Sequence, residues 1–493
     1  MLPLVYLVAV SAILYALLSN WAYDDPFITY RYAHNLAHGL GFVYNPGERI
    51  LSTTTPLFAI LLALLNLAFA DLPNVANLIG AVSLALGALF LWDLSRTYNM
   101  PIVGWTALLL YPTFTLPATT IGSETPIYIA FCLGTFAFYA RQRYISAAAL
   151  AALAALTRPD GVLVAVVLGI DYLLRVRQPI PWKAVIVYTG LLLPWFLFAW
   201  VYFGYPLPVT LAAKQQQGTM AISQTFATGI PWILGWYSGG WQYWAEAILG
   251  VMGLYWLARY ARQWILIIAW TGLYFIAYSL LGVSRYFWYY APLIPGFIIM
   301  VGLGITALFH ALQLSCERIT KRRAVNLDVA SDTASSEAAE SNSCRRLSYM
   351  LSGLLLISLT AAQVFDLWKL STELDPRPIA YRAVGEWIET NTPPEAVVSS
   401  LEIGVIGYYA DRRMVDFAGL LRPEVAQHLV NSVNYEDTAA WTVEKYSPDY
   451  VVLVKGDLRS LKQGYLQENC RVAEDFQSDT FGYGAFINVY ACK

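Results

Sequence analysis

Two adjacent carboxylates near the start of the chain are the side chains best suited to chemistry. Asp24 and Asp25 follow Leu2–Ser19, an apolar run of membrane-spanning length, so they lie where that segment leaves the bilayer. A carboxylate beside a low-dielectric region has a raised proton affinity and suits a general base. Asp25 before Pro26 is also a typical helix start, with the Asp as the cap. A role as helix cap accounts for Asp25 but not for Asp24. We therefore predict that Asp24 is the base and that Asp25 supports it.

Two more charged residues lie at turns between apolar segments. Glu124 opens such a segment and either complements a helix N-terminus or forms a second acidic wall residue that orients a substrate. Arg158 lies in Thr157-Arg158-Pro159-Asp160, where it either clamps the turn onto Asp160 or holds a phosphate whose charge grows in a transition state. We favour the phosphate, because an arginine at membrane depth is costly and usually functional.

Two further cations are candidates for the same phosphate. Arg285 starts an apolar segment and is followed by Tyr286-Phe-Trp-Tyr-Tyr290, whose rings are typical of an interfacial aromatic belt. Lys214, the weaker candidate, lies in segment 204–240, which is rich in Trp, Tyr, Gly and Gln. That composition suits stacking on a sugar or a lid, and equally suits anchoring at the interface.

A histidine pair raises the question of a metal. His34 and His38 lie four residues apart, on one face of a predicted helix over residues 26–38, and could ligate a metal together with Asp25. No adjacent Glu completes the HExxH pattern. We therefore predict no metal ligands and no required cofactor, and leave a divalent metal open.

The elements that carry these residues are those of a polytopic membrane protein. The chain of 493 residues is 58% hydrophobic and only 13% charged, against about 25% charge in soluble domains. Its formal net charge of −2 gives no sign of nucleic-acid binding. The first apolar run lacks the basic start and the cleavage site of a signal peptide, so we expect a retained span.

The apolar segments and the basic loops together predict the topology. Residues 144–174 are broken at Thr157–Gly161, which predicts two short spans joined by a turn, and the short run 56–70, which begins at Pro56, predicts an interfacial helix. Eleven crossings then place every Arg-rich loop in the cytoplasm and the candidate residues outside. The predicted spans are 2–20, 74–93, 102–118, 126–140, two within 144–174, 183–203, 241–258, 263–281, 288–309 and 347–366.

Two regions have the composition of soluble segments. Residues 318–346 read as a disordered cytoplasmic loop, because 324–344 are rich in Ser, Ala and Glu. Residues 367–493 alternate predicted helices and strands, which indicates a small α/β domain outside the cell membrane, following a membrane domain over 1–366 with its first outer loop at 21–73. Cys470 and Cys492 flank two predicted strands and could form a disulfide there.

Several stretches resemble one known superfamily. Asp24–Ala33, Asn35–Arg49 and Thr55–Phe58, with Glu402–Tyr409 and Val415–Leu420 in the tail, are similar to the GT-C superfamily of polyprenyl-phosphate-sugar glycosyltransferases. The terminal arabinofuranosyltransferases look most similar, and protein O-mannosyltransferases and aminoarabinose lipid A transferases look more distant. Leu51-Ser-Thr-Thr-Thr55 departs from the Glu-Gly-Tyr-Thr that this family often has, so a substrate contact made by that Tyr is in doubt.

The resemblance implies a GT-C membrane fold and an inverting transfer on the outer face. An Asp of the first outer loop, matching Asp24, would deprotonate an acceptor hydroxyl that attacks sugar C1 and displaces polyprenyl phosphate. The implied partners are a polyprenyl-phosphate sugar, a glycan, glycolipid or protein acceptor, and the bilayer. The residues expected to bind acceptor or sugar are Glu124, Tyr30, Arg31, His34 and Tyr286.

Two other functions compete with transfer. A transporter or flippase of a lipid-linked sugar usually shows internal repeats, which we do not find, and its charges lie near the midplane, whereas these cluster at the outer ends of spans. A non-catalytic scaffold for envelope assembly would not need an acidic pair facing outer cations.

Overall fold

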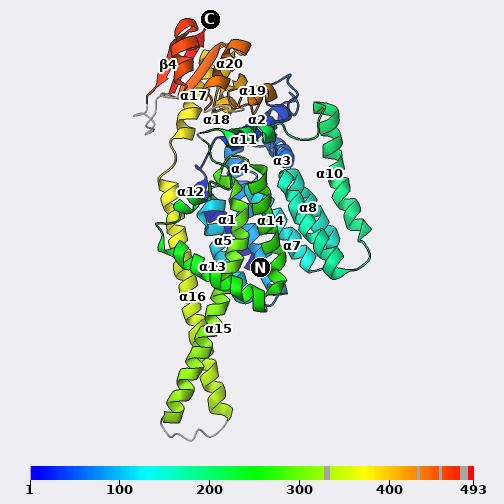
Figure 1. The fold of residues 1–493 in the computed structure, drawn as a ribbon, viewed down its shortest axis with the longest axis vertical. Coiled ribbons are helices and arrows are strands. Elements are labelled where there is room, and N and C mark those ends of the chain that lie inside the picture. Colours follow the sequence, from blue (N-terminus) through cyan, green and yellow to red (C-terminus); the bar gives the residue numbers. More distant parts are fainter. Residues whose placement is uncertain (1, 222, 327–333, 430–433, 455–457, 478–486) are drawn as a thin grey trace.

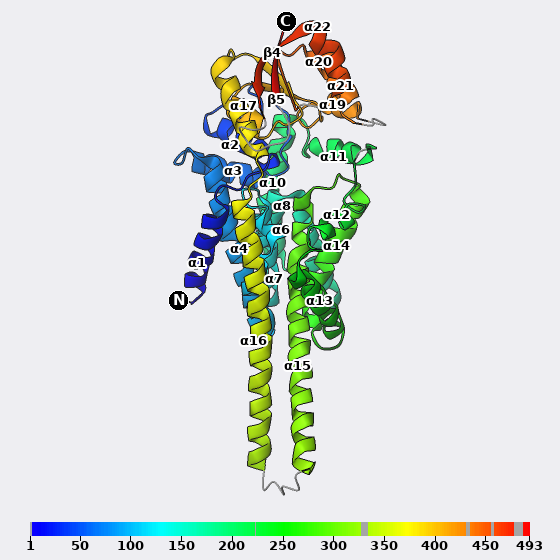
Figure 2. The same ribbon diagram turned by 90° about the vertical axis from the view of Figure 1, so that its left-hand side faces the viewer.

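A helical bundle and a mixed β-sheet stand end to end in this chain. The computed structural model describes residues 2–221, 223–326, 334–429, 434–454, 458–477 and 487–493. The sheet lies at one end of the bundle, and a long pair of helices projects from the other end (Figures 1 and 2).

The helices of the bundle follow the apolar segments of the sequence closely. They are α1 (Leu2–Leu18), α2 (Asp25–Ala37), α3 (Pro56–Asn66), α4 (Leu72–Thr97), α5 (Pro101–Thr113), α6 (Thr115–Ala118), α7 (Thr125–Ala140), α8 (Tyr144–Thr157), α9 (Val162–Asp171), α10 (Trp182–Phe203), α11 (Thr210–Thr219), α12 (Ile230–Gly235), α13 (Trp241–Tyr260), α14 (Ile265–Leu281), α15 (Ile294–Asn326) and α16 (Ala334–Thr372).

The helix boundaries lie where the local chemistry puts them. Proline stands in the first turn of α2, α3, α4, α5 and α7, where its missing N–H costs nothing. The predicted break after α8 is confirmed: Arg158 is extended, and Pro159–Gly161 form one 3-10 turn before α9. The break places the Arg158 side chain at the end of two helices rather than within one.

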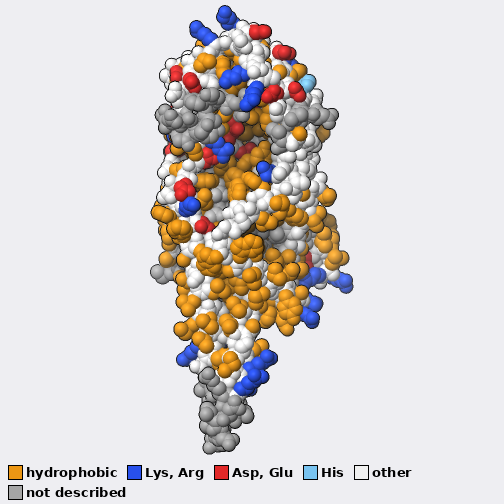
Figure 3. All heavy atoms as spheres, turned by 60° about the vertical axis from the view of Figure 1, so that its left-hand side comes forward, with side chains coloured by type: hydrophobic (Ala, Val, Ile, Leu, Met, Phe, Trp, Pro, Cys, Tyr) orange, Lys and Arg blue, Asp and Glu red, His pale blue; other side chains and the backbone are white. Residues whose placement is uncertain are grey.

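The bundle has the surface of a membrane protein. Hydrophobic side chains form a broad band around its middle, and charged side chains gather beyond the band (Figure 3). Five helical segments of the described chain are long and apolar enough to cross a membrane, and α1, α3, α7 and α8 are shorter apolar helices. The five are Leu72–Thr97, Trp182–Phe203, Arg262–Leu281, Phe287–Arg322 and Ser341–Asn391.

The prediction of a disordered loop over 318–346 is wrong for its described part. Helix α15 continues to Asn326 and α16 begins at Ala334, so only 327–333 lie outside the described residues. Ala, Glu and Arg are good helix formers, and pairing of the two helices supports them. Cys316 is joined to Cys344 by a disulfide across the pair.

The tail alternates helix and strand as predicted. Its sheet has the order β2-β1-β3-β5-β4, with β1 parallel to β2 and β3, and β5 antiparallel to β3 and β4. Cys470 of β4 and Cys492 of β5 face each other in the register and form a disulfide. The tail elements include α17 (Arg377–Asn391), β1 (Val397–Ser400), α18 (Val405–Ala410), β2 (Arg413–Asp416), α19 (Pro423–Gln427), α20 (Glu436–Tyr446), β3 (Tyr450–Val454), α21 (Arg459–Leu461), α22 (Gln467–Asn469), β4 (Cys470–Phe476) and β5 (Ile487–Cys492).

The tail shares a hydrophobic core with the first outer loop. Phe27 and Tyr44 of that loop are buried in one cluster with Val384, Ile406 and Met414 of the tail. Because this core is continuous across the junction, the sheet region is fixed on α2 rather than tethered to it.

Candidate active site

A cavity of about 330 Å³ lies at the sheet-facing end of the bundle. This volume is within the range of about 300–1,000 Å³ that small-molecule sites occupy. The wall comes from α2, the loop before α3, the start of α7, the turn between α8 and α9, α11, α14, the segment 283–289 that follows it, and one tail residue, Leu420. Its polar lining residues are Asp25, Thr29, Ser52, Thr53, Thr54, Thr55, Glu124, Arg158, Asp160, Thr210, Lys214, Tyr278 and Tyr289.

The two adjacent carboxylates point to different partners, which reverses the orientation we predicted. Asp25 lines the cavity, and its Oδ1 lies 3.5 Å from Lys214 Nζ. Asp24 instead accepts hydrogen bonds from the backbone N–H groups of Gly404 and Val405, at 2.9 and 2.7 Å. Burial raises the pKa of Asp24 to about 6, although these two N–H groups oppose the rise. Successive helical residues point about 100° apart, so only one of the pair can face the cavity.

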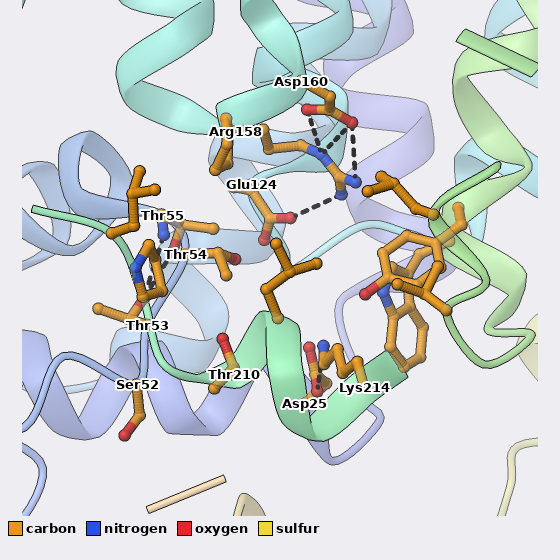
Figure 4. Close-up of a pocket in the computed structure, with 18 of the residues that line it drawn as sticks. Asp25, Ser52, Thr53, Thr54, Thr55, Glu124, Arg158, Asp160, Thr210 and Lys214 are labelled. Atoms are coloured by element: carbon orange, nitrogen blue, oxygen red, sulfur yellow. Dashed lines mark hydrogen bonds and ion pairs between the residues drawn. The ribbon is translucent and has the colours of Figure 1, made fainter. Parts of the chain in front are cut away.

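Arg158 is a cation of the cavity lining and makes the contact to Asp160 that the turn-clamp alternative predicts. Its guanidinium lies within 3.0 Å of Glu124 Oε1 and 3.2 Å of Asp160 Oδ2. It also donates to the Tyr278 hydroxyl at 2.7 Å. Figure 4 shows the contacts of Arg158 with Glu124 and Asp160. Burial raises the pKa of Glu124, and Arg158 opposes that rise. The arginine therefore acts as a turn clamp and still reaches the cavity.

Lys214 lies deeper in the site than its sequence context suggested. Its Nζ is 5.3–5.7 Å from the ring centroids of Tyr286, Trp288 and Tyr289, so aromatic faces surround the ammonium group. Burial lowers the pKa of Lys214, but Asp25, Tyr289 and Glu124 together outweigh it, so the pKa lies above its ordinary value. Lys214 thus stays charged inside the cavity.

Hydroxyl groups form the wall that the sequence reasoning missed. The Oγ1 atoms of Thr29, Thr53 and Thr55 lie 3.0–3.3 Å from one another in a triangle. Ser52 and Thr210 also line the cavity, and each is only 4% exposed. The available signal was the run Ser52-Thr-Thr-Thr55 between an apolar residue and a helix-starting proline.

Arg285, predicted as a candidate for the donor phosphate, is outside the cavity lining. Its Nη1 donates to Gln224 Oε1 at 2.5 Å, and its guanidinium lies 4.5 Å from the Trp232 ring centroid. Tyr286 borders the site through Lys214 without lining it, and donates to Gln217 Oε1 at 2.9 Å. Lys214 lines the cavity and Arg285 does not, although both carry a positive charge. The positions of their segments in the fold therefore decide which cation lies in the cavity.

Three residues of α2 predicted to bind sugar or acceptor also lie outside the cavity lining. The Tyr30 hydroxyl donates to the Gly122 carbonyl at 2.5 Å. Arg31 is buried, donates to the Gly407 and Arg412 carbonyls, and pairs with Asp411 at 3.1 Å. His34 packs against His38 with ring centroids 4.1 Å apart. Across the described ranges, no group of three or more His, Cys, Asp or Glu is placed to hold a metal ion.

The first outer loop therefore carries a second set of contacts, all to the tail. Tyr44 donates to the Ile403 carbonyl, and the Asn45 amide both donates to and accepts from the backbone of Met414 on edge strand β2. Glu48 forms ion pairs with Arg413 and Arg422. Together with Asp24 and Arg31, these residues form what we call the docking face.

Comparison with solved structures shows that this chain shares its fold with an ArnT and with an oligosaccharyltransferase, which supports the predicted GT-C fold. ArnT from Cupriavidus metallidurans bound to undecaprenyl phosphate aligns with a TM-score of 0.63 at 15% identity, covering 99% of this chain and 97% of that one. The oligosaccharyltransferase from Archaeoglobus fulgidus, tethered to an acceptor peptide, aligns with a TM-score of 0.55 at 15% identity, covering 99% and 74%. At this identity the likeness concerns the fold.

Sequence comparison adds one family model. Residues 372–490 match a domain of unknown function, DUF8728, which covers the tail with its sheet. No curated protein matches the chain by sequence.

Proposed function

We propose that this protein is a glycosyltransferase that moves a sugar from a polyprenyl-phosphate donor to a hydroxyl of a cell-envelope glycan or glycolipid. The observation that carries the proposal is one cavity, in a GT-C fold, where the carboxylate Asp25 lies beside the cations Lys214 and Arg158. The ligands named with the similar structures, undecaprenyl phosphate and an acceptor peptide, support the classes of donor and acceptor.

The chemistry follows from the charges of the cavity. The acceptor oxygen attacks sugar C1 while its proton passes to a carboxylate oxygen of Asp25. The bond from C1 to the phosphate oxygen breaks, and the electron pair leaves with polyprenyl phosphate, whose growing charge Arg158 and Lys214 stabilise. A single displacement inverts C1. Asp25 takes the role of base that the sequence reasoning gave to Asp24, and the scheme requires no cofactor.

Glu124 supplies the charge balance for an anionic donor. The cavity holds two cations, Arg158 and Lys214. It also holds three carboxylates, those of Asp25, Glu124 and Asp160, so its formal net charge is −1 before the donor phosphate enters. Protonation of Glu124, whose pKa is already raised by burial, removes that excess. Donor binding is therefore coupled to uptake of a proton by Glu124.

We place the cavity and the tail on the outer face of the membrane, with eleven crossings. The positive-inside rule supports this orientation, because basic residues cluster at the helix ends away from the cavity. They are Arg96, Arg141, Arg143, Arg175, Arg177, Arg259 and Arg262. The residues after 366 then form an extracytoplasmic domain.

The direct test is a donor screen with the purified full-length chain. Polyprenyl phosphates carrying different sugars are mixed with envelope glycan and glycolipid extracts, and release of free polyprenyl phosphate is followed. We expect acceptor-dependent release from at least one donor, unchanged by EDTA. Transport of lipid-linked sugar across vesicles without any release would contradict the proposal and favour a flippase.

A further inference from the structure

One wall of the cavity is built of buried hydroxyls, and these have more hydrogen-bonding capacity than the protein uses. Ser52 Oγ and Thr210 Oγ1 are buried and have no hydrogen-bond partner among the described residues. Thr29, Thr53 and Thr55 bond to one another, and the Thr55 N–H also donates to Thr53 Oγ1, yet the three hydroxyls offer six acceptor lone pairs for these four protons. Burying such groups without partners is costly, so a wall of them is expected where a polar ligand binds.

The spacing of the hydroxyls relative to the charges is regular. On α2, Thr29 follows Asp25 by four residues, and on α11, Lys214 follows Thr210 by four residues. Residues four apart share a helix face about 6 Å apart along the axis. Each helix therefore presents one charged group and one hydroxyl to the cavity, separated by about the width of one sugar ring.

The two segments of this wall are held together by the backbone. The N–H of Val209, just before α11, donates to the Leu51 carbonyl at 3.0 Å, immediately before the Ser52–Thr55 run. Thr53, Thr54 and Thr55 group on one side of the cavity, and Arg158 and Lys214 lie away from them (Figure 4). The hydroxyls of this run thus form a fixed surface on a different side of the cavity from the cations.

We propose that the wall formed by Thr29, Ser52, Thr53, Thr55 and Thr210 binds the ring hydroxyls of the transferred sugar, and that this sugar is uncharged. The proposal rests on the proposed glycosyl transfer, with the donor phosphate at Arg158 and Lys214. Hydroxyls both donate and accept, which matches the hydroxyls of a neutral sugar.

The charges of the cavity support a neutral sugar. Asp25, Glu124 and Asp160 each already pair with a lysine or arginine, so the ammonium of an amino sugar would compete for an occupied carboxylate. The carboxylate of a uronic acid would add to a cavity that holds more carboxylates than cations.

The test compares binding of sugar-loaded and bare polyprenyl phosphate. Thr53→Val and Thr210→Val each remove one hydroxyl and keep the shape of the side chain. We expect each to weaken binding of polyprenyl-phosphate hexose or pentose by about 5- to 30-fold, and to leave binding of bare polyprenyl phosphate within about twofold. Thr210→Ser keeps the hydroxyl and should retain the affinity for the sugar-loaded donor.

Thr106→Val is the matched control, because Thr106 is buried in α5 and donates to the Ile102 carbonyl of its own helix. Equal weakening of both lipids would show that the wall binds phosphate, and a change confined to the acceptor KM would assign it to the acceptor. Either result overturns the proposal, as does tighter binding of an aminopentose or uronic acid donor by the native protein. If binding depends on the sugar but no sugar is transferred, the proposed sugar-binding wall stands and the proposed glycosyltransferase function is wrong.

Discussion

The first outer loop has two faces that differ in how completely their polar groups are bonded. On the docking face, the Asp24 carboxylate accepts hydrogen bonds from two backbone N–H groups, and Arg31 donates to the carbonyl of Gly407 within α18 and to that of Arg412 just after it. On the cavity face, Asp25 has one ion pair at 3.5 Å, and neighbouring hydroxyls lack partners among the described residues. Neighbouring residues of identical type thus lie in unlike surroundings.

The difference separates structural from chemical roles. Bonds from side chains to the backbone of a distant segment fix that segment, because moving it would leave buried polar groups without their partners. A charged group with a single long contact in a cavity keeps capacity for a ligand. By this criterion Asp24 holds the tail in place, and Asp25 is the residue that we propose for the proton transfer.

The largest expected effect comes from exchanging the two carboxylates for amides. Asp25→Asn removes the proposed base, so we expect kcat to fall by about 10²–10⁴-fold while the donor still binds. Asp24→Asn should lower activity by no more than about tenfold. Transfer rates of both variants, measured with the same donor at equal folded protein, check this, and a greater loss in Asp24→Asn would reverse the two roles.

The next largest effect concerns Arg158. Arg158→Gln leaves Glu124 and Asp160 without their cation and removes a donor to the leaving phosphate, so we expect a loss of about 10²–10³-fold in kcat. Arg158→Lys keeps the charge but loses the planar fork, and should fall between the native protein and Arg158→Gln. Arg285→Gln is the control, and steady-state kinetics should show it near the native rate. Equal losses of kcat in Arg158→Gln and Arg285→Gln would contradict the assignment of this cavity as the active site.

Features of the fold and site that depend on local sequence could be predicted, and features that depend on contacts between distant residues could not. The helices, and their break at Thr157–Gly161, follow from local apolar length and from proline and glycine, and were predicted. The orientations of Asp24 and Asp25 depend on Gly404, 380 residues away, which no local pattern contains. Likewise Lys214 and Arg285 look alike in sequence, and only the packing of α11 brings Lys214 to Asp25.

Composition led to a wrong prediction for residues 318–346, and its signal in the run Ser52–Thr55 was missed. The Ser/Ala/Glu-rich stretch suggested disorder, because composition does not show that α15 and α16 support each other. The Ser-Thr-Thr-Thr run was noted only as a departure from a family pattern. A polar run that folds inward, against the usual exposure of Ser and Thr, was recognisable as a site only after its burial was known.

A smaller effect tests the docking face. Asp24→Asn can accept only one of the two N–H groups of Gly404 and Val405, so we expect about 1–3 kcal/mol less stability for the docked tail. Gly404→Ala should act similarly, since an added Cβ would lie 1.9 Å from the Asp24 carbonyl oxygen. Gly353→Ala, where a Cβ meets nothing within 4 Å, is the control. Hydrogen exchange over residues 397–421 measures undocking, and full protection in both variants would contradict this role.

The smallest effect is a pH dependence that belongs to the cavity face alone. Glu124 has a raised pKa, so it is protonated to higher pH than an ordinary Glu with its value of 4.5. As the pH rises through that raised pKa, Glu124 gains charge beside the donor phosphate, and native affinity for bare polyprenyl phosphate should fall by a few-fold. Glu124→Gln stays neutral while keeping an acceptor for Arg158, so its affinity should stay at the low-pH value. Binding curves across this pH range should therefore diverge only on the alkaline side. A variant that follows the native pH profile would place the titrating group elsewhere, with Asp24→Asn as the comparison from the docking face.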